Sequence, residues 1–234
     1  MYIELPENVK SIIEVLYSNG YEAYAVGGCV RDSVLGRKPK DWDITTSALP
    51  QEVKSLFKKT IDTGIKHGTV TVMIKGEGYE VTTYRIDGVY KDGRHLENVT
   101  FSSKLTEDLQ RRDFTINAMA YNDKVGLVDQ FEGMKDLQEG IIRCVGNPSE
   151  RFGEDALRMM RAIRFCAQLG FHMDDNTYKA IVQLAPNIIK VSVERIQVEL
   201  VKTLLSENPD YVQKFQEAGL FIDILPKIDK ILSG

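Results

Sequence analysis

The stretch that most constrains the fold of this chain is residues 24–45, YAVGGCVRDSVLGRKPKDWDIT. Residues 23–26 predict a strand, Gly27-Gly28 a tight turn without side chains, and residues 29–35 a short helix. Such a turn lets backbone N–H groups approach phosphate oxygens, and a helix N-terminus adds partial positive charge. Because Arg31 adds a full positive charge, the stretch predicts a phosphate site on a strand, turn and helix.

The same stretch ends in two carboxylates, Asp41 and Asp43. The alternation over residues 41–45 predicts a short strand, so both carboxylates project from one face of a sheet. Two ionised carboxylates this close repel each other unless a cation lies between them, and hard oxygen ligands favour Mg²⁺ over zinc. An isolated pair of this kind is usually solvated. The upstream glycines and Arg31 are what favour a combined metal and phosphate site.

Composition restricts the class of protein less than these motifs do. The 234 residues carry 30 Lys and Arg against 34 Asp and Glu, and a net charge of −4 argues against wholesale coating of nucleic acid. Three cysteines without metal-type spacing are expected to be small core residues, and their odd number argues against a disulfide framework. With no signal-peptide pattern and no membrane-spanning apolar run, the expected location is the cytoplasm and no membrane partner is expected.

Two further helices and a hairpin are predicted before residue 86. Apolar spacing predicts helices over residues 8–19 and 50–58, and alternation predicts strands over residues 69–75 and 79–85 joined by a turn at 76–78. If this hairpin pairs beside the Asp41/Asp43 strand, Glu80 becomes a third carboxylate near the metals. If it does not, Glu80 is the exposed face of an edge strand.

The rest of the chain changes character near residue 147. Residues 86–99 are glycine-rich, charged and without a period, which predicts a mobile loop. Helices at 105–111 and 114–120 and a strand at 125–129 complete a mixed α/β region, residues 1–146. Residues 147–234 show only helical patterns, namely 150–169, 175–185, 192–206 and 209–218. The predicted fold class is therefore α+β.

One of these helices carries an unusual charged side. Over residues 150–169, about half of the circumference is shared by Arg151, Glu154, Asp155, Arg158, Arg161 and Arg164. Arg158 presents a planar fork of donors and Asp155 two acceptors, which could meet the edge of a base. Taken alone, Glu154 and Arg158 at i, i+4 are equally well explained as a surface salt bridge.

Five motifs in order resemble the class II tRNA nucleotidyltransferases, the CCA-adding enzymes and bacterial poly(A) polymerases of the polymerase beta superfamily. The motifs are Gly27-Gly-Cys-Val-Arg-Asp32 with Asp41-Trp-Asp43, Arg111-Arg-Asp-Phe-Thr-Ile-Asn-Ala118, residues 129–133, Glu154-Asp-Ala-Leu-Arg158 with Arg161, and residues 192–200. The resemblance implies a nucleotidyltransferase head, with a small mixed sheet flanked by helices, followed by an all-helical neck. Members usually continue into body and tail domains that grip tRNA. Because this chain stops at Gly234, we expect those domains to be missing.

The resemblance also implies a function and roles for individual residues. It implies transfer of nucleotides from CTP and ATP to a tRNA 3′ end, with two Mg²⁺ ions held by Asp41 and Asp43. The expected nucleotide-binding residues are Gly27, Gly28 and Arg31 for the triphosphate, Asp113 and Asn117 near the ribose, and Asp155 and Arg158, with Arg161, for the base. Arg112 is also expected to bind the nucleotide. Glu194, Arg195 and Glu199 are expected to be structural.

Within the family, the resemblance favours enzymes that add the terminal A. Residues 67–72 followed by Glu80-Val-Thr-Thr are similar to CCA-adding enzymes, and the Gly-Arg-Arg-Phe-like segment typical of poly(A) polymerases is absent. Residues 86–99 resemble the flexible loop that CC-only enzymes lack. Full CCA addition and A-only addition remain open. A poly(A) polymerase and a catalytically silent RNA-binding module are the alternatives.

Overall fold

The computed structural model describes residues 1–234 except 88–89, 92–94, 97–98, 227–229 and 231–234. The chain forms two compact units. The sheet unit contains Met1–Gly88, Asn98–Arg112 and Ile116–Met134, and the helical unit contains Val89–Glu97, Asp113–Thr115 and Lys135–Gly234. This division falls earlier than the boundary expected between residues 146 and 147, which stays a prediction.

The sheet unit is built on a seven-stranded mixed sheet with the order β11-β10-β1-β2-β5-β4-β3. Its strands are β1 (Ala23–Val26), β2 (Ile44–Thr46), β3 (Thr60–Gly64), β4 (Thr69–Ile74), β5 (Glu77–Thr83), β10 (Met119–Asn122) and β11 (Gly126–Asp129). The β2–β5 pair is parallel, and the other neighbours in this sheet are antiparallel. The expected mixed sheet and the β4–β5 hairpin are confirmed. The hairpin turn is only two residues long, because Ile74 pairs directly with Glu77.

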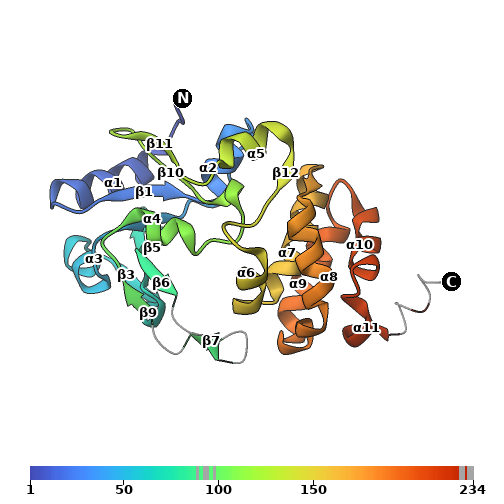
Figure 1. The fold of residues 1–234 in the computed structure, drawn as a ribbon. Coiled ribbons are helices and arrows are strands. Elements are labelled where there is room, and N and C mark those ends of the chain that lie inside the picture. Colours follow the sequence, from blue (N-terminus) through green and yellow to red (C-terminus); the bar gives the residue numbers. More distant parts are fainter. Residues whose placement is uncertain (88–89, 92–94, 97–98, 227–229, 231–234) are drawn as a thin grey trace. The chain divides into compact units, whose positions relative to one another are not determined.

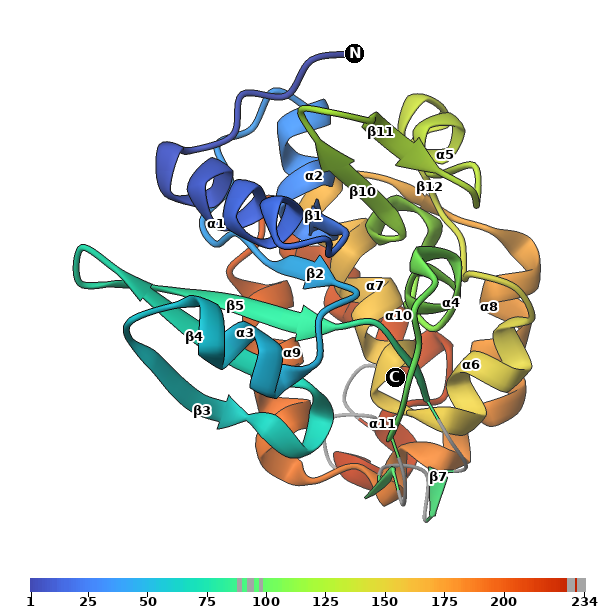
Figure 2. The same cartoon turned by 90° about the vertical axis from the view of Figure 1, so that its left-hand side faces the viewer.

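Four helices accompany this sheet (Figures 1 and 2): α1 (Glu7–Ser18), α2 (Gly28–Val34), α3 (Pro50–Leu56) and α4 (Leu105–Gln110). Helix α1 buries Val9, Ile12, Ile13 and Leu16 at helical spacing and packs against β1, β2 and α3. Helix α3 packs on β4 and β5, and α2 on β1 and β10. A single 3₁₀ turn, η1 (Ile65–His67), precedes β4.

The helix expected over residues 114–120 is wrong. The structure has a 3₁₀ turn, η2 (Thr115–Asn117), followed by strand β10. Strand β10 lies between β1 and β11, and all four of its residues are buried. A strand covered on both faces loses the apolar and polar alternation that would identify it, and its continuous apolar run then fits helical spacing equally well.

Residues 86–99, which were expected to form a mobile loop, include two short strand pairs among the residues that the structure describes there, and their mobility stays a prediction. Strand β6 (Arg85–Asp87) pairs antiparallel with β9 (Val99–Phe101), and β7 (Tyr90–Lys91) pairs antiparallel with β8 (His95–Leu96). Residues 88–89, 92–94 and 97–98 of this stretch lie outside the described residues. These strands pair through backbone hydrogen bonds rather than through an apolar face, so the alternation that would predict a strand is absent from the sequence.

The helical unit contains α6 (Pro148–Glu154), α7 (Leu157–Leu169), α8 (Asp175–Leu184), α9 (Val193–Leu204), α10 (Val212–Glu217) and α11 (Phe221–Ile224). Two 3₁₀ segments, η3 (Ala185–Lys190) and η4 (Pro209–Tyr211), connect them, and a short parallel pair joins β12 (Ile141–Ile142) to β13 (His172–Met173). Helix α5 (Gly133–Glu139) spans the division between the units. In the described part of the chain, no helix is long and apolar enough to cross a membrane.

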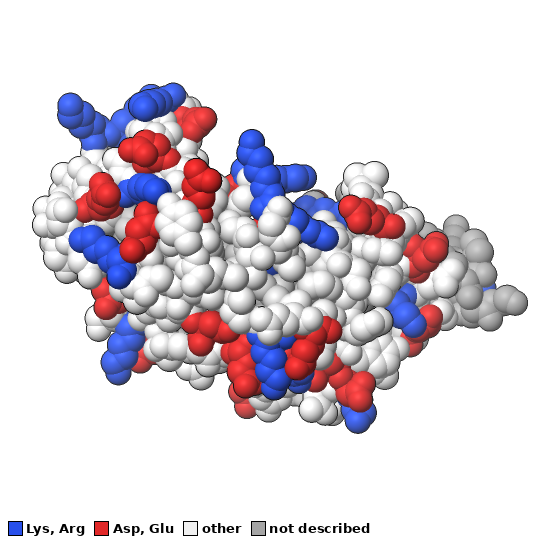
Figure 3. All heavy atoms as spheres, turned by 90° about the horizontal axis from the view of Figure 1, so that it is seen from above, with Lys and Arg blue, Asp and Glu red and all other residues white. Residues whose placement is uncertain are grey.

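The single helix expected over residues 150–169 is broken at Asp155. Asp155 has extended φ and ψ angles of −143° and 104°, and its Oδ1 accepts a hydrogen bond from the Leu157 N–H at 3.1 Å. A short acidic side chain competes for backbone donors in this way and ends one helix while it starts the next. The charged side of α7 is also more buried than expected, since Arg158 is 9% and Arg164 6% exposed. Elsewhere, acidic and basic side chains are interspersed on the face shown in Figure 3.

Candidate functional site

The two aspartates of the sheet unit lie just before strand β2 rather than on it. Strand β2 begins at Ile44, so the strand expected over residues 41–45 starts later than predicted. The Val26 N–H nevertheless donates to the Asp43 carbonyl oxygen at 3.0 Å. This bond continues the β1–β2 pairing back to Asp43 and fixes the backbone that carries its carboxylate.

Parallel pairing of β2 with β5 brings a third carboxylate to the same place. Ile44 lies opposite Val81, so the residues before them, Asp43 and Glu80, are neighbours across the two strands. A cavity of about 660 Å³ is lined by Lys40, Asp41, Trp42, Asp43, Glu77, Gly78, Tyr79 and Glu80. Of the two alternatives that the sequence left open, the structure has the hairpin paired beside the strand that follows the aspartates. We call Asp41, Asp43 and Glu80 the carboxylate cluster.

The carboxylate cluster carries negative charge that no ion pair with a described residue neutralises. None of its three side chains has an ion-pair partner among the residues described here. Displacement of water raises the pKa of Asp43 above its ordinary value, the Arg112 charge opposes this, and Glu80 and Asp41 raise the pKa further. No group of three Asp, Glu, His or Cys residues in the described chain is close enough to hold an ion by itself. Such a cluster suits Mg²⁺, which takes one or two carboxylates together with substrate phosphates and water.

The glycine turn before α2 is closely approached by an arginine. Gly27 has a φ of 81°, and a Cβ added there would lie 3.0 Å from Arg112 Nη1. Glycine is required at Gly27 for both reasons. The Gly27 N–H donates to the Met119 carbonyl oxygen at 3.1 Å, so this particular N–H is used by the sheet. The guanidinium of Arg112 thus lies against the turn at which a phosphate site is expected, and that site stays a prediction.

Two other predicted residues of the sheet unit bind each other. Arg31 is buried, and its Nη1 donates to Asn117 Oδ1 at 2.7 Å, while its Nε donates to Asp32 Oδ1 at 2.8 Å. The residue expected at the triphosphate and the one expected near the ribose are thus adjacent. Their roles stay predictions.

In the helical unit, the predicted residues form ion pairs of their own. Asp113 Oδ2 accepts from Arg161 Nε at 2.8 Å and from Nη2 at 2.6 Å. Arg158 Nη1 donates to Glu154 Oε2 at 2.6 Å. Three expected nucleotide-binding residues are thus held in ion pairs, and their roles stay predictions.

Other charged residues of this unit also form ion pairs. Asp155 accepts from Arg195 Nη2 at 2.7 Å, so Arg195 supports a predicted base-reading residue, which sequence spacing did not show. Arg164 Nε donates to Glu199 Oε2 at 2.6 Å in a pair that is almost fully buried, as suits the structural role expected for Glu199. Burial lowers the pKa of Arg164, and Glu199 opposes that effect.

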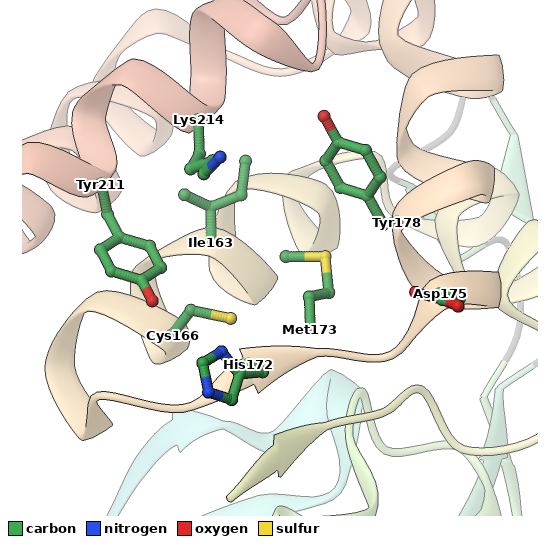
Figure 4. Close-up of a pocket in the computed structure, with 8 residues that line it drawn as sticks. All are labelled: Ile163, Cys166, His172, Met173, Asp175, Tyr178, Tyr211 and Lys214. Carbon is green, nitrogen blue, oxygen red and sulfur yellow. The ribbon is translucent and has the colours of Figure 1, made fainter.

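A second cavity lies wholly within the helical unit (Figure 4), with a volume of about 260 Å³. Its lining is Ile163, Cys166, His172, Met173, Asp175, Tyr178, Tyr211 and Lys214. Lys214 donates to Glu217 at 2.6 Å, and the Tyr211 hydroxyl lies 3.4 Å from the Phe171 carbonyl oxygen. Because the ammonium of Lys214 is already paired with Glu217, this cavity is less suited to a charged ligand than the carboxylate cluster is.

These features define the class of the protein. A strand, glycine turn and helix precede acidic residues on a mixed sheet, a third acidic residue is added by the neighbouring parallel strand, and a helical unit follows. This is the arrangement of a nucleotidyltransferase head followed by a helical domain.

Comparison with known families identifies the group within that class. Residues 23–143 match the poly A polymerase head domain, and residues 170–232 match the family described as probable RNA and SrmB-binding site of polymerase A. The chain therefore belongs to the class II tRNA nucleotidyltransferases, the family of CCA-adding enzymes and bacterial poly(A) polymerases. Nucleotidyltransferases of this family are typically metal-dependent.

Individual relatives agree with this assignment. The CCA-adding enzyme of Leuconostoc mesenteroides is 53% identical over 208 residues, which cover 88% of this chain and 52% of the relative. That of Enterococcus faecalis is 51% identical over 197 residues, 84% of this chain and 48% of the relative. The chain spans about half the length of the curated relatives it matches.

Solved structures show the same likeness. The Bacillus stearothermophilus CCA-adding enzyme in complex with CTP is similar with a TM-score of 0.84 and 48% identity, over 90% of this chain and 51% of that one. The Thermotoga maritima CCA-adding enzyme complexed with tRNA_CCA is similar with a TM-score of 0.80 and 26% identity, over 97% and 57%. The shared fold includes both the sheet unit and the helical unit.

Proposed function

We propose that this chain is a tRNA nucleotidyltransferase that adds CCA, or its terminal A, to tRNA 3′ ends from CTP and ATP. The observation that carries the proposal is the β2–β5 register, which gathers Asp41, Asp43 and Glu80 around one cavity. Relatives named CCA-adding enzyme, and similar structures that contain CTP, ATP or tRNA, support the choice of substrates. The three cysteines are free and buried, which suits the reducing cytoplasm.

The reaction forms a bond between the tRNA 3′ oxygen and the α-phosphorus and breaks the bond from that phosphorus to the bridging oxygen. The hydroxyl loses its proton and pyrophosphate leaves. Bound to Asp41 and Asp43, two Mg²⁺ ions would lower the pKa of the attacking hydroxyl and stabilise the leaving pyrophosphate. The donor set suits these ions because it consists of oxygens whose charge no described cation pairs. Glu80 adds a third oxygen donor beside Asp43.

The side chains around the cluster bind and orient the nucleotide. Gly27 and Gly28 leave space at the turn, and Arg31 and Arg112 supply positive charge for the triphosphate. Asn117, held by Arg31, lies near the ribose. In the helical unit, Asp113 serves the ribose, while Asp155, Arg158 and Arg161 choose the base. The polar edges of these side chains would remain unpaired against U or G, which gives the protein rather than a nucleic acid the role of template.

Extension of three tRNA substrates tests the proposal. Transcripts that end before CCA, after C and after CC are each incubated with one nucleotide at a time and Mg²⁺, and products are resolved at single-nucleotide length. We expect CTP to extend the first two and ATP the third. Extension of the third substrate alone assigns A-only addition, and repeated A addition assigns poly(A) polymerase activity. No extension of any substrate, with CTP still bound, contradicts the enzyme and supports a silent RNA-binding module.

A further inference from the structure

The carboxylate of Asp108 holds two arginines of the sheet unit at once. Asp108 lies on α4 and is 0% exposed. Its Oδ1 accepts from Arg111 Nε at 2.9 Å and Nη2 at 2.7 Å, and its Oδ2 accepts from Arg112 Nη2 at 3.1 Å. A fully buried carboxylate is tolerated only when charged donors satisfy it, so these bonds fix all three side chains together.

The same carboxylate is tied to the strand that follows the carboxylate cluster. The Thr45 hydroxyl donates to Asp108 Oδ2 at 3.1 Å. Thr45 is fully buried on β2, two residues after Asp43. One oxygen of Asp108 therefore contacts both Arg112 and the strand that carries the aspartates.

Held in this way, Arg112 faces the glycine turn. Its Nη1 would lie 3.0 Å from a Cβ at Gly27, and its charge acts on Asp43. Its Nε is buried and has no hydrogen-bond partner among the described residues. An arginine with one nitrogen bonded to an internal anion keeps its other nitrogens in a fixed direction, and here Nη1 faces the turn.

We propose that Asp108 is a positioning residue for nucleotide binding. By holding Arg112 against the Gly27 turn and linking it to β2 through Thr45, it places the guanidinium where the triphosphate of an incoming nucleotide requires positive charge. The inference rests on the proposed function, since it deepens the nucleotide site of the sheet unit. Burial by itself raises the pKa of Asp108, but the charges of Arg112 and Arg111 lower it below its ordinary value, so the carboxylate stays ionised at neutral pH.

A double-mutant cycle separates positioning from a general structural role. Binding of CTP with Mg²⁺ is measured by calorimetry for the parent chain, Asp108→Asn, Arg112→Ala and the double variant. We expect Asp108→Asn to weaken CTP about tenfold in the parent, because a charged hydrogen bond is lost, and less than about twofold when Arg112 is already absent. Equal losses in both backgrounds overturn the proposal, since Asp108 would then act independently of Arg112.

A matched control and a milder variant keep the test decisive. Asp62→Asn makes the same substitution at an exposed acid of the sheet unit that pairs with Lys54, and it should leave CTP affinity unchanged. Thr45→Val retains both ion pairs of Asp108 and should weaken CTP about threefold, again only while Arg112 is present. If circular dichroism shows that Asp108→Asn does not fold, the Thr45→Val cycle decides, and equal losses there overturn the proposal.

The readout also distinguishes this inference from the proposed function. A parent chain that binds CTP but extends no tRNA contradicts the proposed function alone. Additive losses in a chain that binds CTP contradict the role of Asp108 alone. A parent chain that does not bind CTP contradicts both.

Discussion

The carboxylate cluster of the sheet unit and the acidic residues on the charged side of the helical unit differ in whether they form ion pairs. In the sheet unit, Asp41, Asp43 and Glu80 share a cavity and have no ion-pair partner among the described residues. In the helical unit, Asp113, Glu154, Asp155 and Glu199 each pair with an arginine. Carboxylates without an ion-pair partner repel one another unless a cation binds between them, whereas a paired carboxylate is already stabilised by its arginine. The first arrangement is suited to binding charged ligands and the second to fixing a shape.

The largest expected effect is on the carboxylate cluster. Asp43→Asn should reduce nucleotide incorporation by about a thousandfold or more, because it removes one carboxylate of the metal site. The thermal midpoint should stay the same or rise slightly, because repulsion from Glu80 and Asp41 is relieved. Single-nucleotide extension rates and thermal unfolding measure the two effects. Near-normal incorporation would show that Asp43 does not hold a metal, and a markedly lower midpoint would show that its charge is stabilising.

In the helical unit the same kind of substitution should act on stability instead. Glu199→Gln should lower the free energy of unfolding by about 3 kcal/mol, because the buried guanidinium of Arg164 loses its anionic partner. Urea unfolding measures the loss. Glu217→Gln is the control, since its pair with Lys214 is exposed and should contribute less than about 1 kcal/mol. Equal losses at the two positions would mean that burial does not distinguish these pairs.

A substitution in the glycine turn of the sheet unit should have a smaller effect on stability than Glu199→Gln and should also weaken CTP binding. Gly27→Ala should cost about 2 kcal/mol and weaken CTP, because the new methyl group meets both a left-handed backbone and Arg112 Nη1. Gly36 has a similar φ of 69° with nothing within 4 Å, so Gly36→Ala should cost about 1 kcal/mol from the backbone alone and leave CTP affinity unchanged. The comparison fails if both variants bind CTP equally well.

The smallest effect tests whether any paired charge of the helical unit also reads the nucleotide. Arg158→Ala should reduce discrimination between CTP and UTP about tenfold, and it should also lower stability because Arg158 is 9% exposed and pairs with Glu154. Arg151 pairs with the same Glu154 but is not expected to read the base, so Arg151→Ala is the matched control. Relative incorporation of CTP and UTP by each variant gives the ratio. Unchanged discrimination in Arg158→Ala would mean that the pair of Arg158 with Glu154 has a purely structural role.

The motif Arg111-Arg112-Asp113 contains residues of both units. Arg111 and Arg112 belong to the sheet unit, where Asp108 holds them, and the next residue, Asp113, belongs to the helical unit, where Arg161 holds it. The sequence predicts that these residues act on one nucleotide, and it does not show that they are anchored separately. Asp108 could have been found from its i+3 and i+4 spacing to the two arginines on the predicted helix.

The sequence by itself determined the local elements and the family. The strand, turn and helix at 23–35, helix α1 and the β4–β5 hairpin follow from glycine positions and apolar spacing, which depend on residues only a few positions apart. Five motifs in the right order, from the glycine turn at Gly27 to residues 192–200, indicated a nucleotidyltransferase. Local patterns failed where burial on both faces removed alternation, as at β10, and where a side chain competed with the backbone, as at Asp155.

Only the tertiary structure decided which charges pair between elements that are distant in the sequence. The β2–β5 pairing places Glu80 beside Asp43. In the helical unit, the fold pairs residues that are far apart in the sequence: Asp113 with Arg161 (48 residues apart), Asp155 with Arg195 (40) and Glu199 with Arg164 (35). Sequence spacing restricts contacts within one helix or one strand, but it does not say which elements become neighbours. That is why the sequence could indicate the local pair of Glu154 with Arg158, while it could not show the long-range partners of Asp113, Asp155 and Glu199 or the position of Glu80 beside Asp43.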